Sequence, residues 1–181
     1  MVIQRSSGWV DALPKPPLVA QEEAWDCWAA ALSSWLRATR SVYFTREQLV
    51  ERSQRIKGFI GGGPQMSSDP RLFINLINTA EMQPIGMMTK TWDREPPTAM
   101  EFCQMIEESQ YLFLGYKNAA AGHAVVVHGA HTGGALKVMN PGTGREPWRA
   151  FYKQYSIDDF KVPLLIGYKI MFSHGSQLEQ G

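Results

Sequence analysis

The chain has 181 residues, with 18 basic and 17 acidic side chains and a formal net charge of +1. Its length suits one ordinary domain, and 44% hydrophobic with 19% charged residues is a globular composition. Without a charge excess or a basic stripe, nothing favours nucleic acid or an anionic membrane as partner. We therefore expect a single domain that does not select its partner by bulk charge.

The N-terminal residues lack the apolar run of a secretory signal, and no stretch reaches the ~20 apolar residues of a membrane span. These features predict a protein that is cytoplasmic as synthesised. Because the cytosol is reducing, Cys27 and Cys103 are expected to be free thiols rather than a disulfide. Cys103 lies on a helical pattern among apolar neighbours, which is typical of a buried thiol without a chemical role.

Helical patterns come first along the chain. Apolar residues at helical spacing predict a helix from about residues 24–26, with one face against a core. Thr45 with Gln48, and later Thr98 with Glu101, form capping-box patterns that each open a further helix. Short strand patterns follow, in the segments YLFLGY, GHAVVVHG, ALKVM, PWRAFY and VPLLIGYKIM.

This segregation of helices and strands predicts an α+β domain. An N-terminal helical half is expected to pack on a C-terminal antiparallel sheet, with the active-site cleft between them. The proline-rich residues 1–20 predict an extended N-terminal arm, residues 21–173 the single domain, and residues 174–181 a polar tail.

Cys27 is the first candidate for chemistry, because it is predicted on the first turn of the first helix. There the positive end of the helix dipole and the unpaired N–H groups favour a thiolate, so we expect a lowered pKa and a usable nucleophile. Gln21 lies six residues upstream. Its side-chain amide could donate to the oxyanion that forms when the thiolate attacks a carbonyl.

A thiolate nucleophile needs a base and a group that orients the base. His123 lies on the predicted strand GHAVVVHG and Asn140 at the end of the next, ALKVM, with the turn HTGG between them. Pairing these strands places His123 near Asn140, with an error of about two residues in register. We expect the Asn140 oxygen to accept from Nδ1–H of His123, so that Nε2 faces Cys27.

The other histidines fit this chemistry less well. Along the strand His123 and Val125 share one face, so His128 is predicted to point away from Cys27. His131 lies in the turn and His174 in the tail, without neighbours that suggest chemistry. No Cys or His spacing supports a zinc site, so neither a metal nor a cofactor is expected.

The order of these residues and their contexts resembles the papain-like cysteine peptidases. The chain is similar to the bacterial branch that includes double-glycine peptidases, which process bacteriocin leaders, and papain-like secreted effectors. The resemblance covers Gln21 to about Gly142. It implies Cys27 as nucleophile, His123 as general base, Asn140 as orienting residue and Gln21 as oxyanion donor. The bacteriocin-processing branch more often has aspartate where Asn140 stands, whereas papain has asparagine.

The resemblance implies a cysteine endopeptidase that acts on protein or peptide substrates and prefers small residues before the cut. It also implies a secreted effector or interbacterial toxin, delivered to a target cell without a signal peptide and blocked in its producer by a cognate immunity protein. A cell-wall peptide amidase or a glutamine deamidase would use the same constellation around Cys27 and His123. A catalytically silent papain-like binding module is the alternative outside enzymes.

Overall fold

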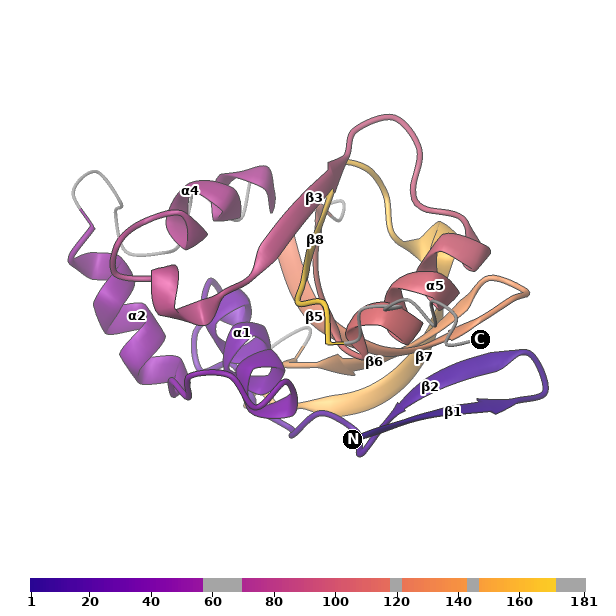
Figure 1. Ribbon diagram of the computed structural model, residues 1–181. Coiled ribbons are helices and arrows are strands. Elements are labelled where there is room, and N and C mark those ends of the chain that lie inside the picture. The colour runs from indigo at the N-terminus through magenta and orange to yellow at the C-terminus, as the bar shows by residue number, and fades with distance from the viewer. Residues whose placement is uncertain (57–69, 118–121, 143–146, 172–181) are drawn as a thin grey trace, which may run out of the picture.

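The computed structural model describes residues 1–56, 70–117, 122–142 and 147–171 (Figure 1). The predicted tail 174–181, with His174, lies outside these residues. Helices α1, α2 and α4 gather at one side and the strands at the other, with α5 packed on the sheet, so the predicted α+β fold class is confirmed. None of the helices in the described ranges is long and apolar enough to cross a membrane.

The helices α1, α2, α4 and α5 span Cys27–Ala38, Arg46–Gln54, Phe73–Ile77 and Ala99–Ser109, and short 3₁₀ turns span Pro70–Leu72, Gln83–Ile85 and Ile157–Asp159. The strands β1 to β8 span Val2–Ser6, Trp9–Leu13, Met88–Trp92, Leu112–Lys117, Gly122–His131, Ala135–Asn140, Phe151–Ser156 and Leu164–Tyr168. All of these strands pair antiparallel in one sheet, in the order β1-β2-β5-β4-β8-β3, and β6 and β7 continue from the other edge of β5.

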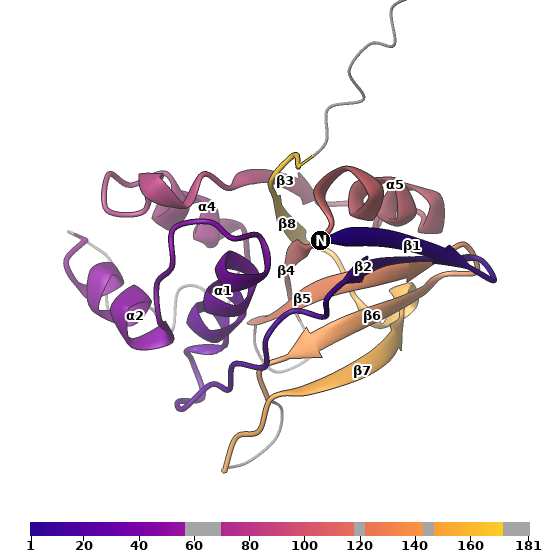
Figure 2. The ribbon, with the colours of Figure 1, turned by 60° about the horizontal axis from the view of Figure 1, so that its bottom comes forward.

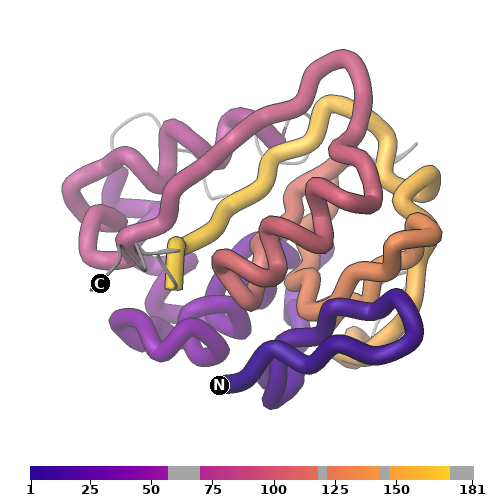
Figure 3. The backbone as a smooth tube through the Cα atoms, turned by 45° about the vertical axis from the view of Figure 1, so that its right-hand side comes forward, coloured from indigo at the N-terminus to yellow at the C-terminus, as the bar shows by residue number. Residues whose placement is uncertain are grey.

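Strand β5 is the centre of the sheet, because it pairs with β4, β2 and β6 (Figure 2). Its first part pairs with β4 and its last part with β2 along the same edge, while β6 lies along the other edge. A register shift between Val127 and Gly129 accommodates this arrangement. Helix α5 packs against β5 and β2, and lies between the β1–β2 hairpin and the β3–β8 pair (Figure 3).

Helix α1 is more deeply buried than its sequence pattern predicts. We expected one face against a core, but every α1 residue except Arg37 is buried. The sheet covers one side, since α1 packs against β5 and β4, and α2 covers another. The serines of α1 bind the chain on its outer side: Ser33 donates to the Phe44 carbonyl over 2.9 Å and Ser34 to the Pro17 carbonyl over 2.6 Å. These bonds satisfy the hydroxyl groups that burial would otherwise leave unpaired.

Both predicted capping boxes are present. Thr45 and Gln48 exchange side-chain and backbone hydrogen bonds at the start of α2. Thr98 and Glu101 do the same at the start of α5. Each box satisfies two N–H groups that a helix start leaves free, and thereby fixes the residue at which the helix begins.

The N-terminal residues are more regular than the extended arm that their prolines predict. Strands β1 and β2 form a hairpin whose turn places Ser7 and Gly8 at φ +48° and +82°. Positive φ at both turn residues matches the twist of two antiparallel strands. Residues 9–11 then pair with 129–131, so the hairpin extends the central sheet, and only the segment after Leu13 runs on to Gln21 without regular structure.

Candidate active site

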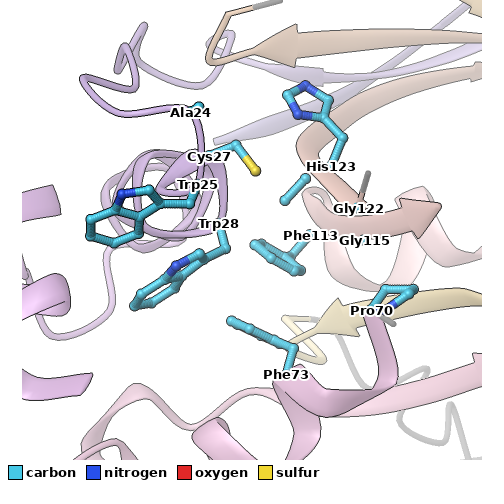
Figure 4. Close-up of a pocket in the computed structure, with 11 residues that line it drawn as sticks. Ala24, Trp25, Cys27, Trp28, Pro70, Phe73, Phe113, Gly115, Gly122 and His123 are labelled. Atoms are coloured by element: carbon cyan, nitrogen blue, oxygen red, sulfur yellow. The ribbon is translucent and has the colours of Figure 1, made fainter. Parts of the chain in front are cut away.

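Cys27 is the first residue of α1 and lies where the helical half meets the sheet. Its side chain faces the His123 ring from across the junction (Figure 4). Cys27 is 7% exposed, and the backbone N–H groups of Ala124, Trp28 and Cys27 itself act to lower the pKa of its thiol. The helix start therefore presents the sulfur to β5, as its place in the sequence predicts.

The predicted lowering of the Cys27 pKa is wrong for the resting site. Burial raises the pKa of this thiol to about 11, because desolvation disfavours the charged form, and the charge of Asp26 adds to the rise. Burial also lowers the pKa of His123, against the effect of its hydrogen bond to Asn140. Burial thus acts against the charged form of both side chains.

The structure brings His123 and Asn140 together, as the predicted strand pairing requires. Nε2 of His123 lies 3.0 Å from Oδ1 of Asn140. This reverses the expected roles of the ring nitrogens, because we predicted that Nδ1 would meet Asn140. With Nε2 bound to Asn140, Nδ1 is the nitrogen left for Cys27.

A second contact of Asn140 assigns the tautomer of His123. The backbone N–H of Gly142 lies 3.0 Å from the same Oδ1 and can only donate, so this atom has to be the amide oxygen. The His123 nitrogen that faces an acceptor must carry the hydrogen, which places it on Nε2. In the neutral ring Nδ1 therefore holds a free lone pair, which is what a base needs.

Two tyrosines support this arrangement, and the sequence patterns did not single them out. The Tyr155 hydroxyl accepts from Nδ2 of Asn140 over 2.9 Å, so all polar groups of that buried amide have partners on the protein. Tyr116 pairs with His123 in the β4–β5 ladder, and their rings meet edge to face at 5.7 Å. A hydroxyl beside an amide and an aromatic edge beside an imidazole restrict both side chains to one orientation.

Gln21 is held by the chain on both sides of the site. Its backbone N–H donates to the Pro141 carbonyl over 3.0 Å, and its side-chain Nε2 donates to the Glu23 carbonyl over 3.0 Å. The side chain is 4% exposed. Gln21 does not line the pocket beside Cys27, and it borders a neighbouring groove with Glu22, Pro147 and Trp148. One of its two amide hydrogens is therefore used by the loop, and the other remains available.

An apolar pocket opens beside Cys27 and His123 (Figure 4). Aromatic side chains and residues with small or no side chains form most of its wall. The lining residues besides Cys27 and His123 are Ala24, Trp25, Trp28, Pro70, Phe73, Phe113, Gly115, Gly122 and Ala124. A lining of this kind suits an apolar group.

The other thiol and imidazole groups of the described residues lie elsewhere. His128 points away from the site, as predicted, and is buried against the Tyr152 ring. His131 lies in the β5–β6 turn region and contacts the Ser7 carbonyl. Cys103 is a free buried thiol on α5. Across the described ranges, no three His, Cys, Asp or Glu side chains gather as a metal site would require.

Comparison with known proteins identifies the class of enzyme. A family model described as the papain-like cysteine protease AvrRpt2 matches residues 11–164, which include the whole site from Gln21 to Asn140. No curated protein matches the chain significantly. The crystal structure of the Pseudomonas avirulence protein AvrPphB is similar at 14% sequence identity with a TM-score of 0.31, over 81% of this chain and 92% of that one. A likeness of that size does not establish a shared fold.

The family match spans most of the chain, and the chain is therefore a papain-like cysteine protease, a hydrolase that uses a thiol. It belongs to the family of the papain-like cysteine protease AvrRpt2.

Proposed function

We propose that this protease is an endopeptidase that cleaves protein substrates with Cys27 as nucleophile, His123 as general base and Asn140 as orienting residue. The observation that carries the proposal is the chain of hydrogen bonds at Asn140. Its oxygen accepts from both Gly142 N–H and His123 Nε2, which leaves Nδ1 as the unprotonated nitrogen of the ring. A nucleophile, a base and a group that orients the base are the parts that acyl transfer needs.

In the proposed reaction the Cys27 sulfur attacks the carbonyl carbon of the scissile peptide bond while its proton passes to Nδ1 of His123. The oxyanion forms beside the backbone N–H of Cys27 and the amide of Gln21. The C–N bond then breaks as Nδ1 returns the proton to the leaving amine. Water attacks the thioester, gives its proton to Nδ1, and releases the acid as the proton returns to sulfur.

The apolar pocket supports a protein substrate with an apolar side chain near the scissile bond. The pocket begins at Cys27 and is lined by aromatic rings of both halves, including Trp28 and Phe113. Burying such a side chain contributes about 1.5–3 kcal/mol, which is enough to select among substrate positions. The resemblance to the double-glycine peptidases implies a preference for small substrate residues before the cut. This preference is a second proposal for the cleft.

We further propose that the protease acts as a secreted effector or toxin in a target cell, with a cognate immunity protein in its producer. The effector class rests on the family to which the chain belongs. Delivery without a signal peptide is part of the same proposal.

Mapping of new protein N-termini in cells that express wild type or Cys27→Ala tests the endopeptidase proposal. We expect cleavage sites with wild type that disappear with Cys27→Ala, and likewise with His123→Ala. His128→Ala is the matched control and should cut as wild type does, because His128 lies away from the site. An equal set of new N-termini with Cys27→Ala contradicts the proposal. If His128→Ala loses cutting and His123→Ala keeps it, the base lies on the other face of β5 and the assignment of His123 is wrong.

A further inference from the structure

The residue before Cys27 does not cap the helix that it precedes. Asp26 occupies the N-cap position of α1, where an aspartate side chain ordinarily accepts a hydrogen bond from the second or third N–H of the helix. Here it makes no such bond, and only its backbone carbonyl accepts, from the N–H groups of Ala29 and Ala30 at 2.9 and 3.1 Å. The carboxylate has turned away from the helix.

The Asp26 carboxylate binds the preceding loop and Arg46 instead. Its Oδ1 accepts from the backbone N–H groups of Glu22 and Glu23, each at 3.2 Å. Its Oδ2 pairs with Nη1 of Arg46, the first residue of α2. Asp26 is fully buried, and an unpaired carboxylate at such a place is strongly unfavourable. Arg46 thus places the opposite charge beside this buried side chain.

Arg46 is itself fixed from several directions. Its side chain is 10% exposed, and Nη2 pairs with Glu22 at 2.5 Å and with Glu47 at 3.0 Å. The capping box of Thr45 sets the start of α2 and therefore the position of Arg46. A planar fork that meets carboxylates on both sides is a geometry that lysine does not reproduce.

The direction in which Asp26 points matters for Cys27. Cys27 and Trp28 are the first two residues of α1, and the N–H of Trp28 is one of the donors that a capping carboxylate would take. The loop that Asp26 ties down carries Gln21, whose amide donates to Glu23. One ion pair thus governs both the helix start and the loop beside it.

We infer that Arg46 is a positioning residue of the active site, which holds the Asp26 carboxylate away from the start of α1. The N–H groups of Cys27 and Trp28 then remain available to the reacting sulfur and the oxyanion, and the loop of Gln21 keeps its place. The inference rests on the proposed role of Cys27 and goes beyond it, because it assigns a function to an ion pair that touches no substrate.

Alkylation of Cys27 by iodoacetamide, followed by peptide mass spectrometry, tests the inference without any substrate. In Arg46→Ala the released carboxylate can cap α1 and stands unpaired beside the sulfur, so we expect alkylation at least about tenfold slower than in wild type. In the Asp26→Ala background, the further change Arg46→Ala should have no effect, because no carboxylate remains to be misplaced. Arg46→Lys should fall between wild type and Arg46→Ala.

Two controls separate positioning from general damage. Arg55→Ala removes the exposed ion pair with Glu51 on the same helix and should leave Cys27 alkylation unchanged. Cys103, buried on α5, reports opening of the whole fold, and its alkylation should remain as slow in Arg46→Ala as in wild type. The inference is overturned if Cys27 in Arg46→Ala is alkylated at the wild-type rate. It is also overturned if Cys27 in the double variant is alkylated as slowly as in Arg46→Ala.

Turnover of a substrate found by N-terminus mapping adds a second readout. Arg46→Ala should lower kcat by about 10- to 100-fold with little change in KM, since the geometry of the reacting groups and not ground-state binding is disturbed. If wild type cuts no protein while the alkylation pattern holds, the proposed endopeptidase function fails and the positioning role stands. If wild type cuts and Arg46→Ala cuts equally well, the positioning role fails alone.

Discussion

The side-chain amide of Asn140 on β6 donates to the hydroxyl of Tyr155 on β7 over 2.9 Å. In the strand ladder Tyr155 pairs with Leu136 and not with Asn140, so its side chain reaches along the sheet to make this bond. Asn140 thus bonds to His123 through its amide oxygen and to the Tyr155 hydroxyl through its amide nitrogen. The orientation of the imidazole thus depends on a third strand that contributes no atom to the reaction.

Replacing Tyr155 by phenylalanine should weaken the site without destroying it. The variant leaves the Asn140 N–H₂ unpaired in a buried place, which costs about 1–3 kcal/mol of the free energy of unfolding. We expect a lower kcat with nearly unchanged KM in steady-state kinetics. Urea unfolding of the same samples measures the loss in the free energy of unfolding. Tyr152→Phe removes another hydroxyl bond of β7, to the Pro16 carbonyl, and should leave kcat unchanged. Equal kcat in Tyr155→Phe and wild type would show that Asn140 needs no support.

Substitution of Asn140 should distinguish the two acceptors that papain-like enzymes use. In Asn140→Asp a carboxylate oxygen can accept from Gly142 and His123, and the Tyr155 hydroxyl can donate in place of accepting. We expect this variant to retain more turnover than Asn140→Ala, and the nearby charge to raise the pKa of His123. The pH–rate profile measures both effects. An Asn140→Asp variant as inactive as Asn140→Ala contradicts the proposed orienting role.

His128 should make the protein less stable as the pH falls. Burial lowers the pKa of His128 to about 4, so the unfolded chain, with a histidine near 6.5, takes up the proton first. Between pH 6.5 and about 4 the unfolded state binds more protons, and the free energy of unfolding falls by up to about 3 kcal/mol. Urea unfolding at several pH values measures the slope. His128→Phe should reduce the dependence of the free energy of unfolding on pH and keep full turnover. An unchanged pH dependence in this variant would show that another group is responsible for it.

Gly115 should control what the apolar pocket accepts. It lies on β4 in the pocket wall, and an added Cβ would stand 3.3 Å from Cβ of Pro70 and 3.9 Å from Cβ of Leu165. Gly115→Val narrows the pocket, so KM should rise for substrates with a large apolar side chain beside the cut and change less for those with a small one. Peptide pairs that differ only at that position provide the measurement. Equal changes for both peptides would place the side chain outside this pocket.

The compartment in which the protein is toxic separates the endopeptidase from the cell-wall amidase. In bacterial cytosol an endopeptidase meets its protein targets, so expression of wild type should impair growth and Cys27→Ala should not. An amidase acts only outside the inner membrane. Growth curves with and without a fused export signal measure the difference, and toxicity only after export, with lysis and cleaved muropeptides, would favour the amidase.

The features that the sequence predicts well are those that neighbouring residues determine. The capping boxes at Thr45 and Thr98 are local hydrogen-bond patterns, and both helices begin where the patterns place them. The pairing of β5 with β6 follows from the valine run and the turn between them. The N-terminal hairpin had a local signal as well, because a Ser-Gly pair separates two short strands, but the prolines that follow pointed to an extended arm.

The features that the sequence did not predict depend on the packed fold. A helix start alone lowers the pKa of Cys27, whereas burial between α1 and β5 raises it, and only the tertiary structure shows that burial is the larger effect. The ring nitrogen that meets Asn140 depends on the rotamer of His123. Tyr155 and Arg46 reach the site from strands and helices that the spacing of Gln21, Cys27, His123 and Asn140 does not involve.

The buried indole N–H of Trp35 donates to the Tyr111 carbonyl over 3.0 Å and so joins α1 to the start of β4. Cys27 lies on that helix, and His123 lies on the strand beside β4, far along the chain. During synthesis the thiol emerges from the ribosome long before the imidazole that serves it. On the proposed mechanism, a nascent chain therefore cannot cut until β5 has also been made and packed beside α1.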